Sequence, residues 1–96
     1  GTPGLPIDGS LPADITGQAE LAWKHILRML EQSKMTIADV VKVVQYLTNA
    51  ADIAPYAQVR NRFLGGAQPA SMLLVIPQLV RPEFRIEVEV TAAKAQ

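Results

Sequence analysis

Two acidic residues near the end of the chain, Glu87 and Glu89, have the type and spacing best suited to acid–base chemistry. They lie in residues 84–90, which read FRIEVEV and alternate apolar with polar side chains. This alternation predicts a strand whose neighbouring side chains lie on opposite faces, so the two carboxylates share one face. Glu87 is therefore a candidate general base. The alternative is an acid that is solvated or ion-paired at a subunit interface.

The other reactive side chains are isolated in the sequence. No histidine follows Ser71, and the single histidine, His25, lies in a helical pattern, so nucleophilic catalysis by Ser71 is not expected. His25 has no second ligand at a suitable spacing, and we predict neither a metal site nor a cofactor. The chain has no cysteine, which excludes disulfides and thiolate chemistry.

Composition narrows the class of protein. The 96 residues suit a single domain over 1–96, and 49% of them are hydrophobic. Nine basic residues balance nine acidic ones, so the chain has no net charge to attract a phosphate backbone, and nucleic acid is not expected as a partner. No stretch is long and apolar enough for a membrane span, and we expect a cytoplasmic location without membrane attachment.

The elements that must position these residues follow from periodicity. Residues 1–12 hold most of the turn formers and predict an irregular leader. A helix is expected up to Ser33, capped by Asp14 or Thr16, with an apolar stripe at helical spacing. The residues of that stripe are Ala19, Ala22, Trp23, Ile26, Met29 and Leu30. A second helix, with caps at Asn49 and Asp52, ends at Gly65-Gly66. Its inward residues are Ile53, Tyr56, Val59 and Phe63.

Three strands are expected, at residues 40–47, 70–76 and 84–90. The first is rich in β-branched residues and apolar on both faces. One face carries Val41, Val43 and Leu47, and the other carries Val40, Val44 and Tyr46. The strand–helix–strand order predicts a parallel pair from the first two strands. The short connection at 78–83 predicts that the last two strands pair antiparallel with each other.

This α/β arrangement places two helices on one face of a single sheet and leaves the other face uncovered. Because the strands at 40–47 and 70–76 are apolar on both faces, the uncovered face would expose more apolar surface than soluble monomers usually do. No further helix remains in the sequence to cover it. We therefore predict a homo-oligomer.

The sequence resembles the YjgF/RidA family, also known as endoribonuclease L-PSP, over nearly its whole length. The resemblance is carried by residues 35–48 (MTIADVVKVVQYLT), by Pro69-Ala70 and by residues 85–89 (RIEVE). It implies a chorismate-mutase-like α+β fold and a homotrimer with a small-molecule ligand at the subunit interface. It also implies an N-terminal strand pair that would precede Gly1.

The resemblance further implies the hydrolysis of reactive enamines or imines, with Glu87 as the catalytic acid–base residue. Ser71, Met72 and Leu73 then bind the substrate. The family's deaminases carry an arginine directly after the Pro-Ala pair, where this chain has Ser71, so the expected substrate is not a simple amino-acid imine. Arg81 and Arg85 are candidate substitutes for that arginine.

Two other functions stay open. One is a non-catalytic ligand-binding or regulatory trimer of the same fold. The other is a ribonuclease, which the neutral charge and the lack of a histidine pair disfavour.

Overall fold

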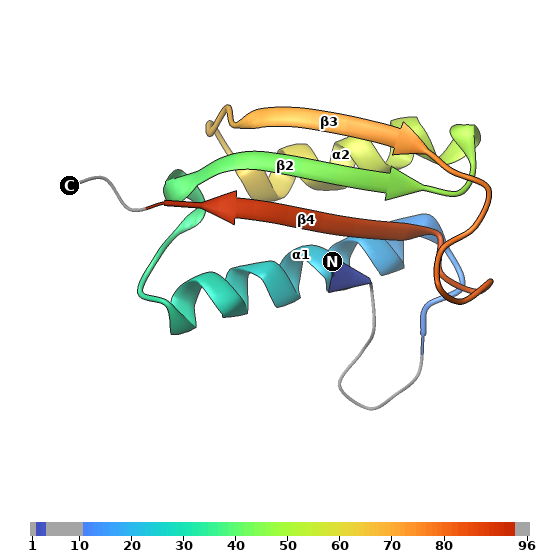
Figure 1. The fold of residues 1–96 in the computed structure, drawn as a ribbon, viewed down its shortest axis with the longest axis horizontal. Coiled ribbons are helices and arrows are strands. Elements are labelled where there is room, and N and C mark those ends of the chain that lie inside the picture. Colours follow the sequence, from blue (N-terminus) through green and yellow to red (C-terminus); the bar gives the residue numbers. More distant parts are fainter. Residues whose placement is uncertain (1, 4–10, 94–96) are drawn as a thin grey trace.

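The computed structural model describes residues 2–3 and 11–93, which form one sheet and two helices (Figure 1). The elements follow in the order β1 (Thr2–Pro3), α1 (Ile15–Gln32), β2 (Val40–Leu47), α2 (Ile53–Leu64), β3 (Ala70–Val75) and β4 (Ile86–Ala92). Short 3₁₀ turns at Ile37–Asp39 and Ala50–Asp52 precede β2 and α2. The sheet has four strands in the order β1-β4-β2-β3, and the predicted mixed fold with two helices is confirmed.

Helix α1 is formed and bounded largely as its sequence predicts. The Asp14 carboxylate accepts a hydrogen bond from the Gly17 backbone N–H at 3.0 Å, which satisfies one of the unpaired donors of the first turn. The helix ends at the Ser33 cap, and Lys34 follows with a φ of 59°. The predicted stripe is buried except at Met29, which is 48% exposed, so its inclusion was wrong.

Strand β2 contains a bulge that changes the faces predicted for its first residues. The register with β4 shifts between Val40 and Lys42, so one extra residue is inserted before regular pairing begins. Val40 and Val43 are both buried, whereas Val41 is 49% exposed. The prediction that Val41 shares a face with Val43 was therefore wrong.

The strand order differs from the one predicted. β3 pairs parallel with β2, as expected, but β4 pairs antiparallel with β2 rather than with β3. In this order both edges of β2 are hydrogen-bonded, whereas a hairpin of β3 and β4 would leave one edge of the apolar β2 unpaired. The leader also differs from its prediction, because Thr2 and Pro3 pair with Val88 and Glu87 at the outer edge of β4.

Helix α2 ends as predicted, at Gly65, whose φ of +60° suits glycine. Its residues Tyr56 and Val59 are buried, as predicted. Ile53, which was also predicted to face inward, lies in the first turn and is 38% exposed. Helix α1 packs against α2, β4 and β1, and the core lies between the helices and one face of the sheet.

We call the opposite side of the sheet the open face. Its apolar side chains include Met72, which is 50% exposed, and Leu74, which is 41% exposed. The strand registers also assign to it Lys42, Val44, Tyr46, Glu87 and Glu89. Both helices lie on the other side, as Figure 1 shows. The homo-oligomer inferred from this uncovered face stays a prediction.

Candidate functional site

The four residues predicted to form the site lie on two faces of the sheet. Glu87 pairs with Tyr46 and lies on the open face, where it is half-buried. Met72 lies on the same face on β3, in register with Val44. Ser71 and Leu73 occupy the alternate positions of β3 and therefore lie on the side that carries the helices.

This arrangement separates Ser71 from Glu87 in two ways. The two residues lie on opposite faces, and β2 runs between the strands that carry them. A side chain on one face of a sheet cannot reach a side chain on the other face through a hydrogen-bonded strand. Within one copy of the chain, the candidate acid–base residue and the candidate serine are therefore not brought together.

Ser71 is held by a buried amide. Gln45, which has no exposed surface, donates a hydrogen bond through Nε2 to the Ser71 Oγ at 3.1 Å. The same nitrogen donates to the Met72 backbone carbonyl at 2.8 Å. The Tyr56 hydroxyl donates to Gln45 Oε1 at 2.8 Å, so both ends of the amide are bonded. This network fixes the orientation of the amide and therefore of the Ser71 oxygen.

The Tyr56 hydroxyl remains a donor in this network. Burial raises the pKa of Tyr56 above its ordinary value, because the phenolate would lose its hydration. The Trp23 indole and the positive charge of Arg60 act in the opposite direction but do not cancel the effect of burial. The Trp23 Nε1 is itself buried, and no acceptor meets hydrogen-bond geometry with it. The phenol therefore stays protonated at neutral pH.

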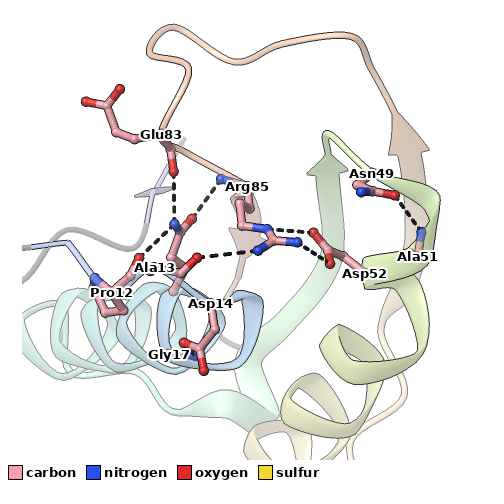
Figure 2. Close-up of polar contacts among 10 residues, drawn as sticks. Pro12, Ala13, Asp14, Gly17, Asn49, Ala51, Asp52, Glu83 and Arg85 are labelled. Atoms are coloured by element: carbon pink, nitrogen blue, oxygen red, sulfur yellow. Dashed lines mark hydrogen bonds and ion pairs between the residues drawn. The ribbon is translucent and has the colours of Figure 1, made fainter.

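Arg85 is occupied in a cluster that joins three elements (Figure 2). Its Nε and Nη2 donate to the two carboxylate oxygens of Asp52 at 3.0 and 2.9 Å, and its Nη1 donates to the Ala13 carbonyl at 3.4 Å. Its backbone N–H donates to Gln18 Oε1 at 2.7 Å. Asp52, predicted as a helix cap, makes no cap bond and pairs with Arg85 instead, while Asn49 caps the turn before α2.

Arg81 is also engaged within its own loop. It forms an ion pair with Glu83, and its guanidinium carbon lies 5.4 Å from the centre of the Phe84 ring. Both arginines proposed as substitutes for the missing family arginine therefore already have carboxylate partners. Neither one lies on β3, next to Ser71.

A concave surface in the described part of the chain has none of these residues in its lining. It has a volume of about 700 Å³ and is formed by the turn before β2, the start of β2, the end of α2 and the start of β3. Its lining comprises Ile37, Ala38, Val40, Val41, Phe63, Leu64, Gly65, Gly66, Ala67, Gln68, Pro69 and Ala70. None of these side chains is titratable, so this surface offers no acid–base group.

Two further properties of the described residues concern metal binding and membrane insertion. Among residues 2–3 and 11–93, no group of His, Cys, Asp or Glu is arranged to hold a metal ion. No helix in the same residues is long and apolar enough to cross a membrane.

Sequence reasoning singled out neither Gln45 nor Arg60. A signal for Gln45 was present, because it is a polar residue at a position that alternation assigns to the buried face of β2. Arg60 follows the buried Tyr56 by four residues, which places both on one side of α2. Because charged residues are usually solvated, the contact of Arg60 with the buried Tyr56 was not predicted.

Comparison with known proteins identifies the relatives of this chain. The sequence model of the endoribonuclease L-PSP family matches residues 1–94. A RutC family protein of Pyrococcus abyssi is 30% identical over 94 residues, which span 94% of this chain and 73% of that protein. TdcF of Escherichia coli, whose name attributes to it the deamination of reactive intermediates, is 23% identical over 97% of this chain and 74% of its own length.

Solved structures agree with the sequence comparison. Rv2704 of Mycobacterium tuberculosis, a member of the YjgF/YER057c/UK114 family, is 27% identical with a TM-score of 0.86, covering 96% of this chain and 73% of its own. The structure of TdcF with bound serine is 21% identical with a TM-score of 0.92, covering 99% of this chain and 77% of its own. The latter similarity concerns the fold alone.

Proposed function

Because the chain belongs to the endoribonuclease L-PSP family, known also as the YjgF/RidA family, we propose that it is a hydrolase that deaminates a small reactive enamine or imine. The reaction takes place in a cleft between subunits of a homotrimer. Family membership and the deaminase activity attributed to TdcF support this reaction class.

The observation that carries the proposal is the separation of Ser71 from Glu87. The two residues lie on opposite faces, with β2 between their strands. If both line one site, the second residue must come from another copy of the chain. The exposed Met72 and Leu74 on the open face give a neighbouring copy an apolar surface to cover.

The proposed chemistry needs one positioned water and one proton carrier. Glu87 takes a proton from the water while the water oxygen bonds to the imine carbon. The π-electron pair of the C=N bond moves to the nitrogen. Proton transfer from Glu87 to that nitrogen gives a carbinolamine. Glu87 then moves the hydroxyl proton to the nitrogen, the oxygen forms the C=O bond, and the C–N bond breaks to release ammonia and a carbonyl product. An enamine enters the same sequence after it is protonated on carbon.

Ser71 sets the expected class of substrate. A hydroxyl forms one neutral hydrogen bond where the guanidinium of the family's deaminases forms two charged ones. The substrate is therefore not a simple amino-acid imine, whose α-carboxylate would rely on that arginine. Ser71, Met72 and Leu73 contact the substrate in this proposal.

The test is ammonia release from freshly generated imines, measured with the purified protein. Glu87→Gln should lower the rate above buffer by about 10²- to 10⁴-fold, because the amide cannot exchange protons with water or nitrogen. Glu89→Gln, two residues away on the same face, is the matched control and should keep most of the rate. Equal losses of rate in the two variants would show that Glu87 is not the catalytic acid–base residue.

A second candidate function is a non-catalytic ligand-binding or regulatory trimer. This alternative is favoured because Ser71 stands where the family's deaminases have the arginine that binds the substrate carboxylate. Ser71 is instead hydrogen-bonded to Gln45. Ligand binding without ammonia release from any imine would favour this alternative. Ser71→Arg tests the cause of such inactivity, since it should restore turnover of amino-acid imines. Light scattering of the purified chain tests the trimer, and a monomer would contradict both functions.

A further inference from the structure

Tyr46 lies directly beside Glu87 on the open face. The two residues are cross-strand partners in the antiparallel pair of β2 with β4, and both are half-buried. Side chains opposite each other in such a pair share one face and have Cβ atoms about 5 Å apart. The bulge that shifts the register lies before Lys42, so the pairing around Tyr46 is regular. A molecule that touches the Glu87 carboxylate is therefore within reach of the Tyr46 side chain.

The hydroxyl of Tyr46 is available to a ligand. Within residues 2–3 and 11–93, this hydroxyl makes no hydrogen bond. The other tyrosine of the chain differs, because Tyr56 has no exposed surface and its hydroxyl donates to Gln45 at 2.8 Å. A phenol both donates and accepts hydrogen bonds. Tyr46 thus offers, on the face that carries Glu87, a donor that the fold of the described residues does not use.

The sheet beyond Tyr46 is apolar on this face. Tyr46 is in register with Leu74 of β3, which is 41% exposed and lies on the side of Tyr46 opposite to Glu87. Val44 and Met72 form the next row of the same two strands. A substituent that extends from Glu87 past Tyr46 toward β3 therefore meets apolar side chains. Such a surface suits an uncharged, apolar substituent.

We propose that Tyr46 is a second catalytic residue, which binds the nitrogen of an imine whose substituents are apolar and uncharged. Its hydroxyl donates a hydrogen bond to the imine nitrogen, where the π-electron pair of the C=N bond arrives as water adds. Glu87 carries out the proton transfers already described, so Tyr46 keeps its proton. Leu74 and its apolar neighbours contact the substituent. This inference rests on the proposed function, because it assigns a residue and a substrate class to the same cleft.

The hydrogen bond can be measured apart from turnover with two probes of nearly the same shape. Acetophenone, the product of hydrolysing acetophenone imine, has an acceptor oxygen, and α-methylstyrene has a CH₂ group in its place. NMR titration gives the affinity of the protein for each probe, and the ring signals of Tyr46 should shift. The ratio of the two affinities, ketone to alkene, should fall by about threefold to tenfold in Tyr46→Phe, because one neutral hydrogen bond is lost.

Removing this hydroxyl should also slow the reaction. Tyr46→Phe keeps the ring and its packing, and kcat for freshly generated acetophenone imine should fall by about 10²-fold, because a donor to the developing charge is lost. KM should change by less than about tenfold. Thr91→Val, the matched control, removes an exposed hydroxyl from the same face, opposite Lys42. It should leave the affinity ratio and kcat within about twofold of the unmodified protein.

Three binding results would overturn the inference. They are no binding of acetophenone, an affinity ratio that Tyr46→Phe leaves unchanged, and an equal fall of the ratio in Tyr46→Phe and Thr91→Val. The proposed function fails separately. A protein that binds the ketone through Tyr46 but releases no ammonia from any imine would keep Tyr46 as a ligand-binding residue and lose the deaminase. Ammonia release that depends on Glu87 but not on Tyr46 would keep the deaminase and lose this inference.

Discussion

Arg85 and Arg60 are the same residue type in opposite situations. Arg85 meets the Asp52 carboxylate, only 5% of which is exposed, in a bidentate pair. Arg60 lies on the ring of Tyr56 and bonds one neutral amide. The charge of Arg85 is neutralised within the fold, whereas that of Arg60 is not neutralised by any carboxylate among residues 2–3 and 11–93.

The counter-ion, rather than the arginine itself, therefore decides how much each guanidinium contributes to the fold. Arg85 joins the starts of β4, α1 and α2 through Asp52 and Ala13. A guanidinium bonded in this way has little left to offer a ligand. Arg60 contacts only Tyr56 and Asn61 on its own helix, so its loss should leave stability nearly unchanged.

The largest expected effect tests the structural half of this comparison. Arg85→Ala should lower the free energy of unfolding by about 3 kcal/mol, because it leaves the buried Asp52 carboxylate without its cation. Arg60→Ala should cost less than about 1 kcal/mol. Urea unfolding of both variants measures the difference. Equal costs would show that the two arginines are not distinguished by their counter-ions.

A smaller effect is expected from the network that links Arg60 to Ser71. Gln45→Met keeps the volume of the side chain but removes the amide. The Tyr56 hydroxyl and the Met72 carbonyl lose their partner, which should cost about 2 kcal/mol. Urea unfolding measures this cost, and the NMR signal of the Ser71 amide should shift. An unchanged stability would mean that the network does not hold Ser71.

The smallest effect is a pH dependence that belongs to Tyr56. Because burial raises the pKa of the folded-state hydroxyl above its ordinary value of 10.0, the unfolded chain loses this proton first as pH rises. The contribution of Tyr56 to the free energy of unfolding is fully present below pH 10. Above pH 10 it is lost, with a slope of up to about 1.4 kcal/mol per pH unit. Urea unfolding at pH 9 and 11 should show a flatter slope for Tyr56→Phe than for the unmodified chain.

Local patterns in the sequence predicted most of the elements but not their order in the sheet. Helix α1 and the glycine end of α2 each depend on a few neighbouring residues, and both are confirmed. The pairing of β4 with β2 depends on which arrangement satisfies both edges of β2. That is a property of the whole sheet, and the short connection before β4 pointed to the wrong neighbour.

The candidate site was predictable only in part for the same reason. Alternation assigned Glu87 to one face of its strand, and the structure agrees. The hydrogen bond from Gln45 to Ser71 joins residues 26 positions apart and depends on the register of β2 with β3. The orientation of Ser71 therefore became predictable only from the fold.

The order β1-β4-β2-β3 has a consequence for how the chain acquires its structure. Of the four strands described, β4 comes last in the sequence, yet it lies in the interior of the sheet, between β1 and β2. Both neighbours of β2 also come later in the chain than β2 itself. Contacts of such long sequence separation slow folding, and the growing chain keeps one edge of β2 unpaired until β4 has been synthesised. The nascent chain is therefore exposed to aggregation through this edge until β4 pairs with it.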